Sequence, residues 1–360
     1  MKSNGRQRGL LLALLVFAAV ARLLYLFAYR SDPFSSHLLH DASVYHHWAS
    51  ALASGHNGES GAFYQAPLYP YLVAALYRIA APDPLAVYVF QLVLGIVTIF
   101  LVFRSACRAY GEAAGLAAAT ITTLYAPLVF FETKLLSASV AVFLSALLIE
   151  RMQAADSTRR EVEWLIPGAV LGLAALTQPG LLVTGLLGTV WISLDRSRPP
   201  RQRVLRVLYL VVGAGLVILP VTIRNYRVSG EWVVIASNGG VTCYQGNNPN
   251  AVGVFSTPPG FSGKITEQRA ESRRLAEEEA GTSMGDGAVS SFYFHKALAF
   301  LSDDLLHATG LLTGKFLLAA ANDEQPLEYN QRLDVNPFRR LFPVPFAVVL
   351  ALAAVRVFSR

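Results

Sequence analysis

Hydrophobic residues recur along the chain in long runs separated by short polar or charged segments. A run of about 20 apolar residues can cross a bilayer as a helix. Candidates for such spans are 9–29, 85–106, 113–131, 134–150, 204–223 and 341–358. Two shorter apolar stretches, 164–178 and 180–194, meet at TQPG, a sequence that favours a helix break and a turn. The pattern predicts an all-α polytopic membrane protein with about eight transmembrane helices.

The stretch 67–81 is apolar but shorter than these runs, opens with prolines and carries Arg78. If it does not cross, the arginines and lysines of the short connections gather on one side of the membrane. If it does cross, the five-arginine segment 195–206 moves to the other side. Positive charge collects in cytoplasmic loops. We therefore interpret 67–81 as an interfacial helix and place both termini in the cytoplasm.

This topology divides the chain into a transmembrane module, 1–223, an extracytoplasmic segment, 224–340, and a final span within 341–360. The module includes an outer loop, 30–84, with interfacial helices. The segment 224–340 is more polar and is predicted to be mixed and partly irregular, with a second interfacial helix over 305–321.

Composition supports a membrane protein. Hydrophobic residues make up 54% of the chain, charged residues only 15%, and the mean hydropathy is +0.43. The net charge is +6. Because the cations gather in the connections on one side of the membrane, they indicate the topology and not a nucleic-acid partner. Cys107 and Cys243 fall on opposite sides of the membrane and cannot pair.

Polar and aromatic side chains that could take part in a reaction are concentrated in HDASVYHHWA, residues 40–49. A helix starting there places Asp41, Tyr45 and Trp48 on one face. Asp41 is a candidate site residue, with Tyr45 and His46 as a supporting wall. The alternative is that Asp41 only caps an interfacial helix with an aromatic belt.

Glu132 lies in FFETKLL, between two predicted spans, and by topology it emerges on the same side as Asp41. A carboxylate at the edge of hydrocarbon is costly, so it is a second candidate site residue. The alternative is a structural ion pair with Lys134, two residues on.

Three further features concern ligands. The sequence QAPLYPYL brings Tyr69 to the headgroup level. Arg224, in LPVTIRNYRVSGEW, is predicted on the outer side of the membrane, although most arginines are predicted inside. It either binds a lipid phosphate or anchors the helix end among the headgroups. The histidines near Asp41 have no recognised zinc spacing, so no cofactor is certain, although a divalent metal could assist.

The motifs resemble a known family when they are taken in order. They are D-A-x-x-Y-H-x-x-A after the first span, A-P-L-Y-P-Y-L, F-E-T-K-L-L, R-N-Y and a later G-N-N-P. The combination is similar to bacterial membrane glycosyltransferases of the GT-C superfamily, near the protein O-mannosyltransferase and aminoarabinose-transferase group (glycosyltransferase family 39). It covers most of residues 8–250. Where many relatives have an Arg-Pro pair, this chain has Gln178-Pro179, and relatives often continue with further spans.

The resemblance implies a hexosyl or pentosyl transfer from a polyprenyl-phosphate carrier to a hydroxyl of a protein, lipid or glycan. It makes Asp41 the catalytic residue, Glu132 a second acidic residue and Arg224 a contact to the carrier phosphate. Lys134 would help to neutralise that phosphate. The expected location is a bacterial plasma membrane, with the site on the outer face. The competing classes are a transporter or flippase and a non-catalytic assembly subunit, and the isolated Arg22 within a span is the main feature a transporter would use.

Overall fold

The computed structural model describes residues 5–31, 35, 37–56, 61–158, 160–254, 256–258 and 260–320. These residues form α-helices and two short 3-10 turns, and no strand occurs among them. The predicted all-α class is therefore confirmed, and the described part of the outer segment is helical with irregular connections.

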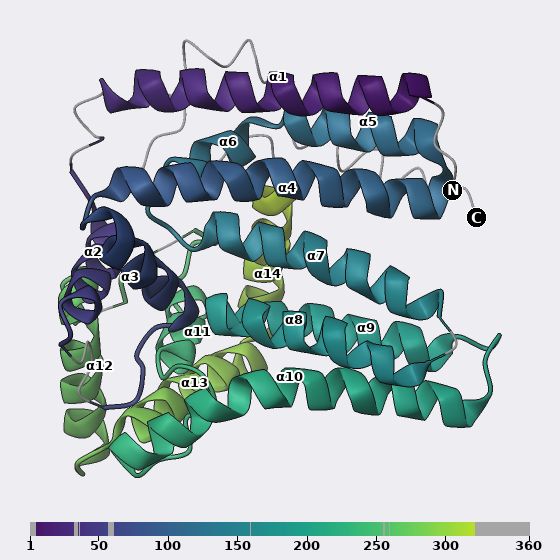
Figure 1. Ribbon diagram of the computed structural model, residues 1–360. Coiled ribbons are helices and arrows are strands. Elements are labelled where there is room, and N and C mark those ends of the chain that lie inside the picture. The colour runs from purple at the N-terminus through teal and green to yellow at the C-terminus, as the bar shows by residue number, and fades with distance from the viewer. Residues whose placement is uncertain are drawn as a thin grey trace.

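Four long helices run alongside one another and define the bundle, with α8 (Leu165–Thr177) between the last two of them (Figure 1). They are α1 (Gly5–Arg30), α4 (Pro84–Tyr110), α7 (Ala138–Asp156) and α10 (Pro200–Ser229). Each is long and apolar enough to cross a membrane. Large apolar side chains such as Phe27, which is 76% exposed, cover their outer faces, as expected for helices that face lipid.

Shorter helices complete the bundle and differ in part from the predicted spans. The stretch 113–131 is divided into α5 (Glu112–Thr123) and α6 (Ala126–Glu132). The stretches 164–178 and 180–194 form α8 (Leu165–Thr177) and α9 (Leu182–Leu194), and the break falls at Gln178 as expected. The span at 341–358 lies outside the described residues, so the total of eight stays a prediction.

Helices α8 and α10 approach closely because glycines line their contact. A Cβ on Gly168 would overlap the Leu210 carbonyl oxygen, and one on Gly213 would overlap that of Leu165. Small residues let membrane helices approach until their backbones touch. This contact holds α10 against the bundle and thereby positions Arg224 near its end.

The first outer loop forms α2 (His40–Ala53) and α3 (Leu68–Ala80), which lie together at one end of the bundle (Figure 1). One prediction is wrong in detail, because Asp41 does not cap α2. The cap position is Leu39, whose side chain makes no capping bond, and Asp41 lies in the first turn. Its carboxylate accepts a hydrogen bond from Gln65, 24 residues further along the chain.

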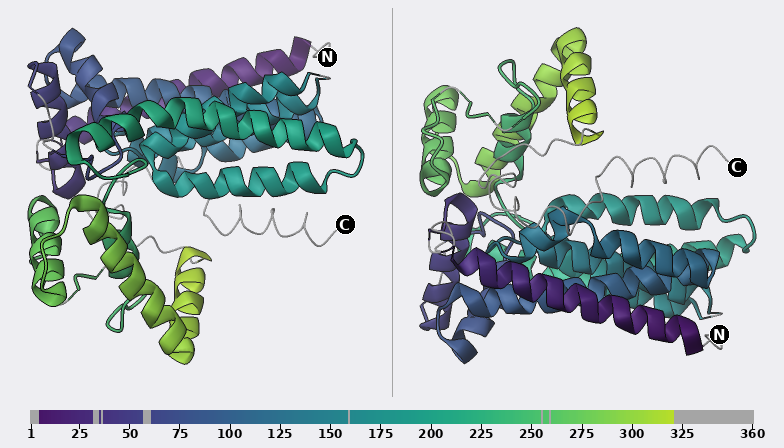
Figure 2. Two further views of the ribbon diagram at one scale, coloured as in Figure 1. Left: turned by 90° about the horizontal axis from the view of Figure 1, so that it is seen from below. Right: turned by 90° about the horizontal axis from the view of Figure 1, so that it is seen from above.

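The outer segment contributes four helices that lie to one side of the bundle, with α12 beside α2 (Figure 2). They are α11 (Gly239–Gly246), α12 (Ile265–Ala280), α13 (Asp286–Asp303) and α14 (Leu305–Ala320), the last matching the helix predicted over 305–321. Asp286 pairs with Arg269 and Arg273, joining α12 to α13. Arg269 also donates to the Ala62 carbonyl, 3.0 Å away, which attaches the segment to the first outer loop.

Candidate functional site

Asp41 is held at the start of α2 by a side chain from the loop before α3. The Gln65 amide nitrogen donates to Asp41 Oδ1 at 3.0 Å. The carboxyl is half-buried, and this burial raises the pKa of Asp41 above its ordinary value, against the opposing effects of the Gln65 hydrogen bond and the His40 charge. A carboxylate with a raised pKa accepts a proton more readily than an exposed one.

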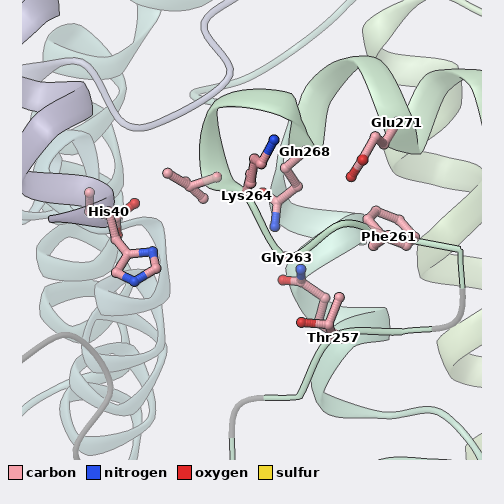
Figure 3. A pocket seen from close by; sticks show the side chains of 10 residues that line it. His40, Thr257, Phe261, Gly263, Lys264, Gln268 and Glu271 are labelled. Atoms are coloured by element: carbon pink, nitrogen blue, oxygen red, sulfur yellow. The ribbon is translucent and has the colours of Figure 1, made fainter.

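Asp41 lines a cavity of about 180 Å³ between α2 and the outer segment. Figure 3 shows His40 on one side of it and Gln268 and Phe261 on the other. The remaining wall comes from Gln245, Thr257, Gly263, Lys264, Ile265 and Glu271. Sequence reasoning missed these residues. Their only signal was the high polarity of 224–340, which does not tell which residues reach back to α2.

A chain of buried contacts runs from α2 toward the turn after α6. The rings of Tyr45 and Tyr69 meet edge to face with centroids 5.1 Å apart. The Tyr69 hydroxyl donates to Gln91 at 2.9 Å. The Gln91 amide nitrogen then donates to the carbonyl oxygens of Glu132 and Lys134, at 2.9 and 2.8 Å. Four of the predicted site residues are therefore connected through Gln91, a polar residue within a predicted span.

Glu132 forms a buried ion pair with Arg22 of α1, with Nε 2.8 Å from Oε2. The side chains of Arg22 and Glu132 are only 1% and 3% exposed. The expected alternative, a pair with the neighbouring Lys134, is replaced by a partner 110 residues away. Gly95 of α4 makes room for the carboxylate, because a Cβ there would overlap Glu132 Oε1. Glu132 borders a different cavity from Asp41, one of about 250 Å³ with mostly apolar walls.

Lys134 is fully buried among aromatic rings. Its Nζ lies 3.8 Å from the centroid of Tyr29 and 4.8 Å from that of Phe130. Such faces stabilise a cation by their quadrupole. The structure therefore holds the Lys134 amine beside the last turn of α1, close to the α2 end of the bundle.

His46 borders a different cavity from Asp41. Its Nδ1 lies 2.8 Å from the Tyr77 hydroxyl, and the ring borders a cavity of about 450 Å³ with Arg30 and Asp83. Burial and the charge of His47 lower the pKa of His46, so its ring favours the neutral form.

Arg224 packs on the loop that carries Gln65. Its guanidinium carbon lies 3.9 Å from the centroid of Phe63, and Nη1 donates to the Gly61 carbonyl. The neighbouring Asn225 is fully buried and accepts from the Phe63 amide at 3.1 Å. Arg224 and Asp41 are thus joined through the short loop 61–65, although each contacts a different part of it.

Replacing Arg224 by alanine is expected to destabilise the protein by about 1–3 kcal/mol, because the ring of Phe63 and the Gly61 carbonyl lose their partner. Thermal unfolding in detergent measures the effect. Arg227→Ala provides the control, since Arg227 is exposed less than one turn away on the same helix. Equal melting temperatures for the two variants would show that the loop does not depend on Arg224.

No three histidine, cysteine, aspartate or glutamate side chains are grouped closely enough to hold a metal ion within the segments that the structure describes. A divalent metal at the site therefore has no ligand set among them, and its participation stays a prediction.

Part of the chain is similar to a known protein family. Residues 64–223 match the family model described as dolichyl-phosphate-mannose-protein mannosyltransferase. The comparison with curated proteins gives no match. Among solved structures, the oligosaccharyltransferase of Archaeoglobus fulgidus, tethered with an acceptor peptide containing the NVT sequon, is similar with a TM-score of 0.39 and 12% identity. That alignment covers 96% of this chain and 54% of the archaeal one, so this chain spans about half the length of that protein. The match to this mannosyltransferase family therefore covers the central part of the apolar helical bundle, residues 64–223, and is a similarity over less than half of the chain.

Proposed function

We propose that this protein transfers a hexosyl or pentosyl group from a polyprenyl-phosphate carrier to an acceptor hydroxyl, with inversion at the anomeric carbon and Asp41 as the general base. The position of Asp41 carries the proposal. Its half-buried carboxylate lines a cavity at the α2 end of the bundle. A carrier anchored in the bilayer presents its phosphate at the headgroup level, the depth that this end of the bundle is proposed to occupy.

The reaction needs one base and a stabilised leaving group. The acceptor oxygen attacks the anomeric carbon while Asp41 takes the hydroxyl proton. The bond from the anomeric carbon to the phosphate oxygen breaks, and polyprenyl phosphate leaves with the electron pair. Phosphate is a good leaving group, so the mechanism needs no covalent enzyme intermediate and no strong general acid.

Positive groups near the leaving phosphate would lower the barrier by neutralising its developing charge. Lys134, buried against Tyr29 and Phe130, and Arg224, anchored on the 61–65 loop, are proposed for this role. Tyr45 and Tyr69, whose rings contact each other, are proposed to form a wall behind Asp41. Glu132 is proposed as a positioning residue, because its buried pair with Arg22 and the Gln91 bonds hold the turn that carries Lys134.

The acceptor is proposed to enter from the outer segment, between α2 and α12. The cavity there offers two amide side chains, Gln245 and Gln268, and the ring of Phe261. Such groups bind hydroxyl-bearing molecules, which include protein side chains, lipids and glycans. We place this end of the protein on the extracytoplasmic face of a bacterial plasma membrane, with both termini in the cytoplasm, because the opposite arrangement puts the arginine-rich connections outside.

The experiment is an assay of the purified full chain in proteoliposomes with radiolabelled polyprenyl-phosphate mannose and, separately, a pentosyl donor. We expect release of polyprenyl phosphate and a glycosylated acceptor with inverted anomeric configuration. A parallel reaction with a chelator tests the divalent metal. Movement of the intact donor across the bilayer without a product would instead indicate a flippase, for which the buried Arg22–Glu132 pair is the supporting observation. No turnover and no movement would indicate a non-catalytic subunit.

A further inference from the structure

One face of α10 carries a row of exposed large apolar side chains along most of the helix. The row repeats at spacings of three or four residues, which keeps its members on one side. It runs from Val204 through Leu208, Leu216 and Ile223 to Tyr226. The opposite face, which includes Leu210 and Gly213, is buried, and Gly213 packs against α8.

The length of this exposed row matches the hydrocarbon layer of a bilayer. At a rise of 1.5 Å per residue, the distance along the helix from Val204 to Tyr226 is about 33 Å, and the layer is about 30 Å thick. Helix α10 is also one of the four helices long and apolar enough to cross a membrane. The exposed row is therefore the face that α10 presents to the lipid tails, and Tyr226 lies where the tails give way to headgroups.

The exposed row ends in a stacked pair of aromatic rings. The ring of Trp232, in the segment that follows α10, lies on the ring of Tyr226 with centroids 4.5 Å apart and an angle of 25° between the planes. The Trp232 residue is 72% exposed and Tyr226 is 43% exposed. Tryptophan and tyrosine favour the border between headgroups and hydrocarbon, because each combines a large apolar ring with one polar group.

Hydrogen bonds to the backbone fix the segment that carries Trp232. The side-chain nitrogen of Asn225 donates to the carbonyl oxygens of Val233 and Ile235, both at 3.0 Å. Val233 and Ile235 are buried, whereas Trp232 and Val234 are exposed, so alternate side chains turn inward and outward. The fold itself therefore holds the Trp232 ring on the outside of the molecule, beside the end of the exposed row.

We propose that Tyr226 and Trp232 insert into the headgroup layer of the bilayer and anchor the end of α10 there. The inferred partner is a lipid surface and not a soluble molecule, because Tyr226 is the last member of the row that faces the lipid tails and Trp232 stacks directly on it. The argument uses only the exposed face of α10 and the segment after it, so it does not depend on the proposed sugar transfer.

The anchor also sets the depth of the loop 61–65. Asn225, next to Tyr226 in α10, accepts a hydrogen bond from the Phe63 amide at 3.1 Å. Gln65 of the same loop donates to Asp41 at 3.0 Å. A chain of direct contacts therefore joins the aromatic pair to Asp41.

Tryptophan fluorescence of the full chain in phosphatidylcholine vesicles tests the proposal. The lipid is brominated either near the headgroup end of its acyl chains or near their far end, so that each kind of vesicle quenches tryptophans at one depth. The part of the emission that Trp232→Phe removes belongs to Trp232. We expect the shallow bromines to quench this part more strongly than the deep ones. Acrylamide dissolved in the water should quench it more weakly than it quenches free tryptophan.

Trp48 provides the matched control, because its ring packs on Phe63 at the same end of the molecule but the residue is buried. The emission that Trp48→Phe removes should respond to neither brominated lipid. Trp232→Phe should melt as the wild type does, since the exchanged ring is exposed. Quenching of the Trp232 emission by acrylamide and by neither lipid would place the ring in water, as for a soluble partner such as a glycan. Stronger quenching by the deep bromines would place it in the hydrocarbon core, and either result would overturn the proposal.

Discussion

Asp41→Asn is expected to lower the rate of sugar transfer by about 10²–10⁴-fold, the contribution of a positioned general base, while the protein remains folded. Asparagine has the same shape as aspartate, and its oxygen can still accept the hydrogen bond from Gln65. Burial raises the pKa of Asp41, so the ionised carboxyl opposes folding once the pH has risen through that pKa. At neutral pH the variant should therefore melt no lower than the wild type.

The raised pKa of Asp41 also predicts how the transfer rate of the wild type depends on pH. Asp41 acts as a base only when ionised, so the rate should fall as the pH drops through its raised pKa, above the range where an exposed aspartate titrates. In Asp41→Asn the transfer rate should no longer fall in this way as the pH drops. Asp303→Asn, at an exposed carboxylate at the end of α13, should keep both the wild-type rate and its decrease at low pH. A folded Asp41→Asn protein with undiminished transfer would remove Asp41 from the mechanism.

Glu132→Ala is expected to be the most destabilising of the substitutions considered, by about 3–5 kcal/mol, because it leaves Arg22 buried without a counter-charge. Two guanidinium nitrogens of Arg22 already lack a hydrogen-bond partner among the described residues, so no second acceptor is in place there to take over. Thermal unfolding in detergent should show the loss directly.

The double variant Arg22→Met/Glu132→Met separates stability from catalysis. Replacing both charges of a buried pair with apolar side chains of similar volume often restores stability. If Glu132 also positions the site, the double variant should be stable yet slow in transfer. A double variant with wild-type transfer would assign Glu132 a purely structural role, and a single Glu132→Ala variant as stable as the wild type would contradict the cost of the buried pair.

The elements of the fold follow largely from local pattern. Span length, the break at Gln178 and the short helix after Pro67 each depend on a few neighbouring residues and on the solvent they face. Where local pattern was ambiguous, prediction was less accurate. The run 113–131 has the composition of one apolar span, yet the helix breaks at Leu124 and Tyr125. Helix α6 then begins with Pro127 in its first turn, where the missing N–H of proline costs no helical hydrogen bond.

By itself, the sequence determined that this is a helical membrane protein with Asp41, Tyr45 and Tyr69 at one end, because hydropathy and helical periodicity act over short stretches of chain. Only the tertiary structure decided the partners. Glu132 has Lys134 two residues away and Arg22 in another span, and the packing of α1 against the bundle selects Arg22. Likewise, residues of α12 complete the cavity of Asp41 although more than 200 positions separate them. A buried charged side chain pairs with the opposite charge that tertiary packing places within about 3 Å of it. The separation of two residues in the sequence does not determine that distance.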